Sequence, residues 1–225
     1  MLHDGPPVEP RLSSSVLLVR PGEPWEVLLL RRPGGADFAP GAWVFPGGSV
    51  HGADADQPDP LRAAALRELF EEAGVLIGRG ARGAIRADEL TQVRQLLAQG
   101  RSWSEALTTV GITLAPDRLS LFTRWITPEQ VRKRFDTSFY LARVPPGQEI
   151  HPQPGEIEEW RWIVPSVALE DDTITLVFAT RRILESVARE RDPARLIARV
   201  RRRRSIATVT PRIIQTPDGG SEIVV

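Results

Sequence analysis

The most informative segment of the sequence is Arg67-Glu-Leu-Phe-Glu-Glu-Ala-Gly74. Its three carboxylates stand three and four residues apart, which is the spacing of neighbours on one face of a helix. These carboxylates belong to Glu68, Glu71 and Glu72. The apolar residues of the same turns, on the opposite face, are Leu66, Leu69, Phe70 and Ala73. The stretch therefore predicts a helix with one face in the core and a concentrated negative charge on the other.

The three carboxylates allow two interpretations. At ~5 Å separation and an effective dielectric constant of ~20, a like-charged pair repels by roughly 3 kcal/mol, so an enclosed cluster needs a counter-ion. A hard divalent cation, Mg²⁺ or Mn²⁺, prefers carboxylate oxygens. On a solvated helix face the same pairs cost only ~0.2–0.5 kcal/mol and need no metal. The glutamates alone leave both interpretations open.

A glycine-rich turn precedes this helix. Gly41-Ala-Trp-Val-Phe-Pro-Gly-Gly48 is an apolar run closed by Pro-Gly-Gly, and glycine lets the backbone come close to a ligand or ion. Together with Arg-Glu-x-x-Glu-Glu-x-Gly, the turn resembles the signature of the Nudix hydrolases, which cleave a nucleoside diphosphate linked to another moiety. The resemblance implies an α/β fold, an α/β/α sandwich with a mixed β-sheet between helices. Strands mixed with two helices that each have one apolar face favour the same architecture.

The first half of the signature departs from the family pattern. That pattern runs Gly, five residues, Glu, seven residues and then Arg-Glu. Counting back from Arg67 places Asp59 where the first Glu belongs and Ala53 where the first Gly belongs. We therefore expect a lengthened loop from Val50 to Pro60 ahead of the helix.

A wider resemblance covers roughly Ser13 to Thr180. Its segments are Trp125 to Pro128, Arg134 to Ala142 and Glu156 to Trp162. They look like the Nudix branch that includes the mammalian peroxisomal type 19 protein, which is similar to the coenzyme A diphosphatases. The upstream signature of the diphosphatases is partly present: Arg32, Gly41 and Phe45 to Gly48 match, whereas Leu30, Pro33 and Asp37 depart. Coenzyme A or acyl-coenzyme A is thus the leading substrate, with nucleotide sugars, dinucleoside polyphosphates and NADH as competitors.

The resemblance also implies roles in a metal-assisted reaction. Glu68, Glu71 and Glu72 would hold one or more Mg²⁺ or Mn²⁺ ions, and Gly48 would add a backbone carbonyl. We assign Arg67 to orienting the cluster, since a guanidinium can fix a carboxylate by a charge-assisted pair; a surface arginine is the alternative. The general base is predicted to be Glu71 or Glu72. Other candidates for the base are Glu156, Glu158 and Glu159.

Residues outside the helix are candidates for binding the substrate. They are Arg32 and Gly47, and also Arg134 for a phosphate and Phe135 for stacking on a base. Core packing is an equal alternative for Phe135. His51 is more typical of a solvated loop than of a metal ligand. A solvated helix end likewise explains the run Arg201 to Arg204 better than a phosphate or RNA site does.

Composition limits the other classes of function. With 225 residues and 41% hydrophobic content, one large domain is expected. The 29 basic and 29 acidic residues balance, which argues against a nucleic-acid partner. The absence of cysteine excludes disulfides, thiolate metal sites and cysteine nucleophiles. Short apolar runs and an N-terminus unlike a secretory signal favour a cytoplasmic protein without a membrane partner. Many family members are dimers, so a homodimer stays open.

The order of predicted elements suggests a main domain and a tail. Strands are expected at residues 13–19, 25–30, 42–45, 119–126, 138–144 and 159–164, and helices at 61–73 and 175–191. A helical insert at 78–113, with helices at 87–98 and 103–110, is expected at one edge of the sheet. The predicted domain covers residues 10–195, followed by a strand-turn-strand tail at 196–225. A catalytically silent binding module with the same fold is the rival functional hypothesis.

Overall fold

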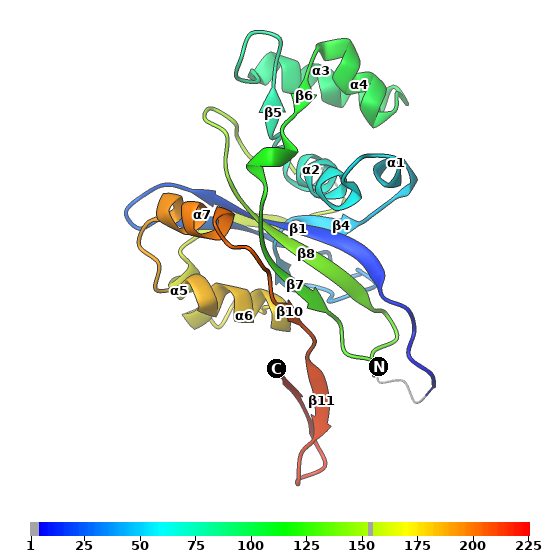
Figure 1. The fold of residues 1–225 in the computed structure, drawn as a ribbon, viewed down its shortest axis with the longest axis vertical. Helices are drawn as coiled ribbons and strands as arrows, with labels where there is room; N and C mark the ends of the chain where they lie inside the picture. Colours follow the sequence, from blue (N-terminus) through cyan, green and yellow to red (C-terminus); the bar gives the residue numbers. More distant parts are fainter. Residues whose placement is uncertain (1–4, 153–154) are drawn as a thin grey trace.

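A computed structural model describes residues 5–152 and 155–225 of the chain. The described residues form an α/β/α sandwich around a mixed eight-stranded sheet with the strand order β10-β7-β8-β1-β2-β3, in which β4 also pairs with β1 and β9 with β2 (Figure 1). The strands are β1 (Arg11–Arg20), β2 (Glu26–Arg31), β3 (Trp43–Val44), β4 (Gly47–Ser49), β7 (Ser120–Ile126), β8 (Phe135–Arg143), β9 (Glu159–Ile163) and β10 (Thr208–Val209). This architecture confirms the predicted fold class.

Strand β1 lies at the centre of the sheet and is buried on both faces. It pairs with β8 in parallel and with β2 and β4 in antiparallel orientation. Because side chains alternate along a strand, Val16 and Leu18 enter one core while Leu17 and Val19 enter the other. The continuous apolar run of β1 thus supplies both cores.

Helix α2 (Pro60–Ala73) covers one face of the sheet, as predicted. Asp59 caps its first turn by accepting a hydrogen bond from the Arg62 backbone N–H, and Gly74 ends it in the left-handed conformation at φ 70°. Leu66, Leu69 and Ala73 pack against the sheet. The short helix α1 (Gly52–Ala55) precedes α2, so the predicted loop from Val50 to Pro60 is partly helical.

The insert packs against the outer side of α2 and not at the sheet edge, which corrects the predicted position (Figure 1). Its helices α3 (Ala87–Ala98) and α4 (Trp103–Val110) have the predicted bounds and are flanked by the paired strands β5 (Gly78–Arg79) and β6 (Thr113–Leu114). Phe70 explains this placement, because its ring points away from the sheet and packs with Val93 and Leu107. A short 3-10 helix, η1 (Pro116–Arg118), leads back to β7.

Helices α5 (Pro165–Glu170), α6 (Phe178–Val187) and α7 (Pro193–Arg201) cover the other face of the sheet. The helix predicted at residues 175–191 is wrong in extent, because the Trp43 backbone N–H donates to the Thr175 carbonyl and holds that segment alongside β3. Helices α5 and α7 were not predicted. Leu196 and Val200 of α7 join the core, and the expected boundary at residue 195 falls inside this helix. The division into domain and tail stays a prediction.

The C-terminal residues form the predicted strand-turn-strand unit. Strand β10 joins the main sheet beside β7, and β11 (Arg212–Gln215) then pairs with β12 (Ser221–Val224) in a separate two-stranded sheet. This hairpin projects from the body of the molecule (Figure 1). Residues 153–154 of the predicted loop from Pro145 to Gly155, and Met1 to Asp4, lie outside the described residues. Among the described residues, no helix has the length and apolar character that a bilayer crossing requires.

Candidate active site

The glycine turn lies directly against α2. Gly47 and Gly48 belong to β4, which pairs with Ser13 to Ser15 of β1. A Cβ atom on Gly47 would stand 2.2 Å from the Ser14 carbonyl oxygen, and one on Gly48 would stand 2.2 Å from the Glu68 Oε1 atom. The Gly47 position requires glycine because its neighbours are backbone atoms, whereas an added Cβ at Gly48 would displace the Glu68 carboxylate. The turn thus brings its backbone against a carboxylate of α2.

Arg67 is the centre of the site and is only 7% exposed. Its Nη1 atom donates to Glu71 Oε2 at 2.6 Å, and its Nη2 atom donates to the Ser49 carbonyl at 3.0 Å and pairs with Glu68 Oε1 at 3.0 Å. Its Nη2 and Nε atoms also reach Asp54 at 2.9 and 3.2 Å. Burial lowers the pKa of Arg67, but the bonds to Asp54 and the charges of Glu68 and Glu71 raise it above its ordinary value. The alternative of a surface arginine is therefore wrong.

Asp54, and not Asp59, occupies the position of the first acidic residue of the signature. Its side chain is buried, binds Arg67 and accepts a hydrogen bond from the His51 backbone N–H at 2.9 Å. The ion pair between Arg67 and Asp54 is buried, since the two side chains are only 9% and 4% exposed. Asp59 instead caps α2. The interval from Gly48 to Asp54 does contain the five residues that the family pattern requires, so the signal was present in the sequence.

Glu72 is buried beside the glycine turn. Its Oε2 atom accepts a hydrogen bond from the Gly47 backbone N–H at 2.8 Å. The pKa of Glu72 is raised to about 8, mainly by burial and also by the charges of Glu68 and Glu156, against the opposing effects of the Gly47 bond and Arg32. Burial and the Glu71 charge likewise raise the pKa of Glu68. For both carboxylates, burial outweighs the nearby positive charges of Arg67 and Arg32.

As they stand, the carboxylates do not surround one point. Among residues 5–152 and 155–225, no three acidic, histidine or cysteine side chains are arranged to hold a metal ion. Arg67 holds Glu68 and Glu71, and Gly47 holds Glu72. The oxygen donors nevertheless suit a hard divalent cation, which would offset the repulsion among these carboxylates. The residues fit such an ion chemically, because Arg67 pairs with one oxygen of Glu68 and one of Glu71 and each carboxylate has a second oxygen. Their metal role stays a prediction.

The three alternative bases differ in their surroundings. Burial and the Glu71 charge raise the pKa of Glu156, which places this carboxylate beside the cluster. Glu158 instead accepts from the Gly34 N–H at 2.9 Å and pairs with Arg31 at 3.0 Å. Glu159 pairs with Arg161 at 2.8 Å. Glu156 thus interacts electrostatically with Glu71, whereas Glu158 and Glu159 are paired with Arg31 and Arg161.

A largely apolar cavity of about 700 Å³ borders the glycine turn. Three predicted substrate-binding residues line it: Arg32, Gly47 and Phe135. The Arg32 Nε atom donates to the Phe38 carbonyl at 2.9 Å, and the rings of Phe38 and Phe135 meet edge-on with centroids 5.4 Å apart. The other aromatic residues of the wall are Phe45, Trp125, Phe139 and Phe178. The cavity could hold an apolar or aromatic group next to the carboxylates.

Arg134 has a different environment from the one predicted. It is 92% buried, and its guanidinium donates to the Val8 carbonyl at 2.6 Å and the Thr127 carbonyl at 3.1 Å. It does not line the cavity. These bonds give Arg134 a structural role in joining the N-terminal segment to the end of β7, and nothing in the geometry supports a phosphate contact.

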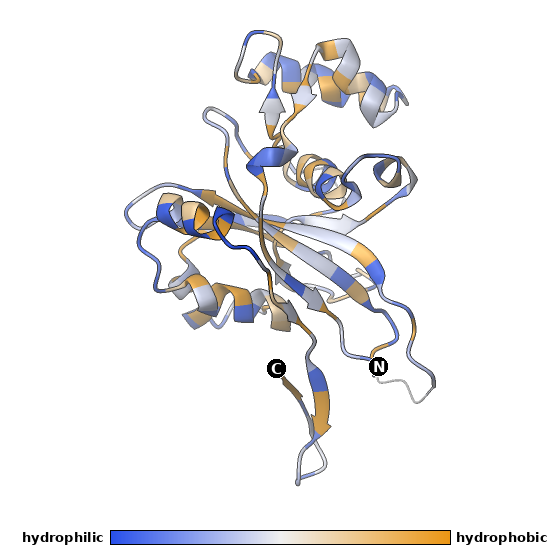
Figure 2. Ribbon diagram, viewed as in Figure 1, coloured by the Kyte–Doolittle hydropathy of each residue, from blue (hydrophilic) through white to orange (hydrophobic). Residues whose placement is uncertain are grey.

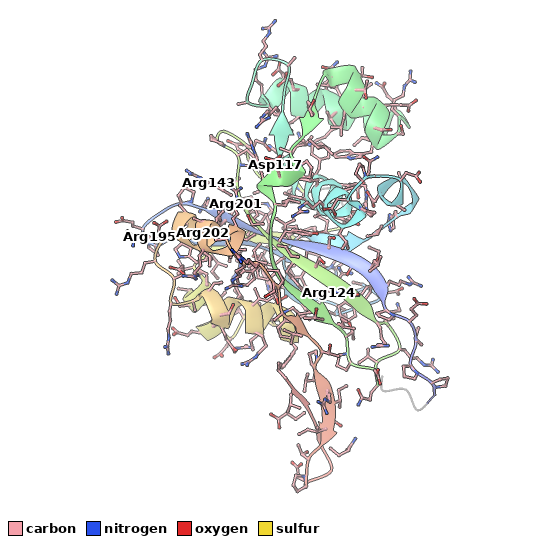
Figure 3. The ribbon with its side chains drawn as sticks, viewed as in Figure 1. Asp117, Arg124, Arg143, Arg195, Arg201 and Arg202 are labelled. Carbon is pink, nitrogen blue, oxygen red and sulfur yellow. The ribbon has the colours of Figure 1, made fainter. Side chains whose placement is uncertain are left out.

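The arginine run lies at the end of α7, where Figure 3 labels Arg201 and Arg202. Arg201 donates to the Ser120 hydroxyl at 3.1 Å, and Arg203 donates to the Phe122 carbonyl at 3.4 Å and lies over the Phe122 ring. Two members of the run therefore attach α7 to β7. His51 is exposed and begins α1 through its backbone, as expected of a loop histidine.

Comparison with known proteins gives consistent matches. The model of the NUDT19 Nudix domain matches residues 56–179. A putative nudix hydrolase 7 of Caenorhabditis elegans is 36% identical over 146 residues, which cover 64% of this chain and 48% of that protein. The acyl-coenzyme A diphosphatase NUDT19 of Xenopus laevis is 24% identical over 207 residues, with 65% of this chain and 54% of that protein covered. The chain thus spans about half the length of these relatives.

A solved structure shares the fold over most of the chain. The crystal structure of a Nudix hydrolase from Alicyclobacillus acidocaldarius has a TM-score of 0.71 and 25% identity, and the match covers 84% of this chain and 96% of that one. The match to the domain model begins after Asp54, so it includes α2 but not the glycine turn. The position of the glycine turn against α2 is therefore evidence for the site that is independent of this match.

Proposed function

Because the chain belongs to the Nudix superfamily, in the branch of the NUDT19 Nudix domain, we propose that it hydrolyses a pyrophosphate bond in a nucleoside diphosphate-linked small molecule with Mg²⁺ or Mn²⁺. The observation that carries this proposal is the network around Arg67. One buried guanidinium contacts Asp54, Glu68 and Glu71, and the neighbouring Glu72 accepts from the turn at Gly47. A solvated helix face would not bury its carboxylates in this way.

The α2 carboxylates and Arg67 have different roles in the proposed hydrolysis. Glu68, Glu71 and Glu72 would hold the cation, with the Gly48 carbonyl as a further oxygen donor. When bound, the cation neutralises charge on the phosphate oxygens and lowers the pKa of a coordinated water. Arg67, fixed by Asp54, orients Glu68 and Glu71 by charge-assisted bonds.

Proton removal from the attacking water is assigned to Glu71 or Glu72. Glu71 exposes 32% of its side chain, so a water molecule can reach it. Glu72 is buried and already accepts the Gly47 bond, which favours holding an ion over exchanging protons with solvent. Glu156 is the alternative base, because its carboxylate lies close enough to Glu71 for their charges to interact. Replacing each of the three by Gln and following the pH dependence of turnover separates them.

Coenzyme A or acyl-coenzyme A is the leading substrate. The apolar cavity beside Gly47 would take the part of the substrate beyond the pyrophosphate, and Arg32 stands in its wall. The name of the Xenopus laevis relative, an acyl-coenzyme A diphosphatase, supports the same class. Nucleotide sugars, dinucleoside polyphosphates and NADH are competing substrates of the same reaction.

A substrate panel tests the proposal. The purified chain is incubated with coenzyme A, octanoyl-coenzyme A, ADP-ribose, a nucleotide sugar, a dinucleoside polyphosphate and NADH, each with Mg²⁺ or Mn²⁺, and the products are identified by mass spectrometry. Two products divided at the pyrophosphate bond are expected from at least one substrate. Cleavage of ADP-ribose but not of either coenzyme A compound would refute coenzyme A as the substrate and would still support pyrophosphate hydrolysis. Binding without any cleavage would favour the silent binding module.

A further inference from the structure

The C-terminal hairpin of β11 and β12 is separate from the main sheet. A two-stranded hairpin alone is marginally stable in water, so its position depends on what it packs against. Strand β10 anchors the preceding chain by pairing Val209 with Trp125 of β7. The Gln130 side chain then donates to the Ile213 carbonyl at 3.4 Å. The hairpin is therefore attached next to the residues that border the cavity.

One face of the hairpin contributes to the cavity wall. Pro211, which is buried, and Ile223 of β12 both line the cavity. Ile213 stands directly opposite Ile223 in the antiparallel pair, so the two side chains share a face. Ile214 pairs with Glu222 and belongs to the other face. The hydropathy colouring shows hydrophobic residues in this projecting hairpin (Figure 2).

Ile223 keeps free apolar surface although it lines the cavity. It is 37% exposed, whereas the cavity residues Trp125 and Phe139 are at most 9% exposed. The Trp125 indole N–H is buried and, in the part of the chain that the structure describes, has no hydrogen-bond partner. This wall therefore contains exposed apolar surface on Ile223 and an unpaired N–H on Trp125. A molecule bound in the cavity would cover the first and could accept a hydrogen bond from the second.

We infer that Ile223 is a specificity-determining residue: it contacts the apolar group of a substrate in the cavity and favours nucleoside diphosphate derivatives that carry such a group. The inference rests on the proposed function for its substrate class. The contact is non-local, because Ile223 follows the Nudix-matched segment by more than 40 residues. The hairpin thus contributes a part of the cavity wall that lies outside the segment matched by the Nudix domain model.

The first test compares matched variants in the full chain. Ile223→Ala removes apolar surface from the cavity, and Ile214→Ala removes the same surface from the opposite face, where the residue is 43% exposed. The ratio of kcat/KM for octanoyl-coenzyme A to that for coenzyme A is measured with Mg²⁺. We expect Ile223→Ala to lower this ratio by roughly tenfold and Ile214→Ala to leave it unchanged, because a few carbons in an apolar pocket change discrimination by about that factor. Equal ratios in all three proteins would overturn the inference.

The second test needs no turnover and so separates the inference from the proposed function. The chain has no cysteine, so Ile223→Cys and Ile214→Cys each carry a single thiol. Alkylation by N-ethylmaleimide is timed in EDTA with and without octanoyl-coenzyme A. Protection at position 223 but not at 214 supports the inference even if the panel shows no hydrolysis. Unchanged alkylation at position 223 in saturating octanoyl-coenzyme A would refute it.

Discussion

Replacing Asp54 by Ala should destabilise the fold far more than the same change at Asp59. The Asp54 side chain is 4% exposed and accepts bonds at 2.9 and 3.2 Å from Arg67, whose side chain is 9% exposed. Removing one partner of a buried ion pair costs about 3–5 kcal/mol. Arg67 retains Glu71 at 2.6 Å and the Ser49 carbonyl at 3.0 Å, so we expect the lower end, about 3 kcal/mol.

Asp59→Ala is the matched control. It removes a helix cap, worth about 1 kcal/mol, and a half-exposed ion pair with Arg62 that adds little. In a chain of this length, the melting temperature should fall by about 6–12 °C for Asp54→Ala and about 2–4 °C for Asp59→Ala. Urea titration followed by tryptophan fluorescence gives the free energies of unfolding directly.

Turnover separates the two variants further. Without Asp54 the guanidinium of Arg67 loses its anchor, so Glu68 and Glu71 are no longer held in place and hydrolysis should fall. Asp59→Ala should keep hydrolysis near the level of the unmodified chain. Equal losses of stability, or a greater loss for Asp59→Ala, would show that the position of the first acidic residue has been misassigned to Asp54.

Three other changes probe the same site. Gly48→Ala should lower turnover strongly, because its Cβ would stand 2.2 Å from the Glu68 carboxylate, whereas Gly52→Ala meets nothing within 4 Å and should be silent in the same assay. In metal-free protein, the free energy of unfolding should fall as pH rises from about 4.3 to about 8, because folded Glu72, with its pKa raised to about 8, then binds more protons than the unfolded chain. Urea titrations of Glu72→Gln at several pH values should show a smaller fall of the unfolding free energy with pH. An identical pH dependence in the variant would contradict the raised pKa of Glu72. Mg²⁺ should raise the melting temperature of the unmodified chain but not of Glu72→Gln, as measured by scanning calorimetry.

Local sequence signals were enough to predict the elements that carry the site. The spacing of Glu68 to Glu72, the cap at Asp59 and the glycine at position 74 determine α2, and its observed bounds differ from the predicted ones by one residue. The helices of the insert were predicted with their observed bounds because both have regular apolar spacing. The apolar run from Ser13 to Val19 predicted a strand, which the structure extends to Arg11–Arg20. For these elements, the residue pattern within one segment is sufficient to predict the secondary structure.

Features that depend on distant contacts were missed. Asp54 was overlooked because extra residues stand between it and Arg67, and fixed counting from the helix therefore reached Asp59. Helix α7 was missed although Asp192 and Pro193 are a clear helix start, because its many arginines obscure the stripe of Leu196 and Val200. The partners of Arg134 and the place of the insert over Phe70 come from other segments, and no local pattern predicts them.

The dependence of pyrophosphate cleavage on free Mg²⁺ is the sharpest test of metal-assisted hydrolysis by the α2 carboxylates. The rate is measured from zero to saturating Mg²⁺ for the unmodified chain and for Glu72→Gln, with the best substrate of the panel. We predict no cleavage in EDTA, a saturable rise with Mg²⁺, and a loss of roughly 100-fold or more in the variant, as for other groups that stabilise charge in a transition state. Cleavage that persists in EDTA, or an equal rate in the variant, would contradict the claim that the carboxylates of α2 act through a divalent cation.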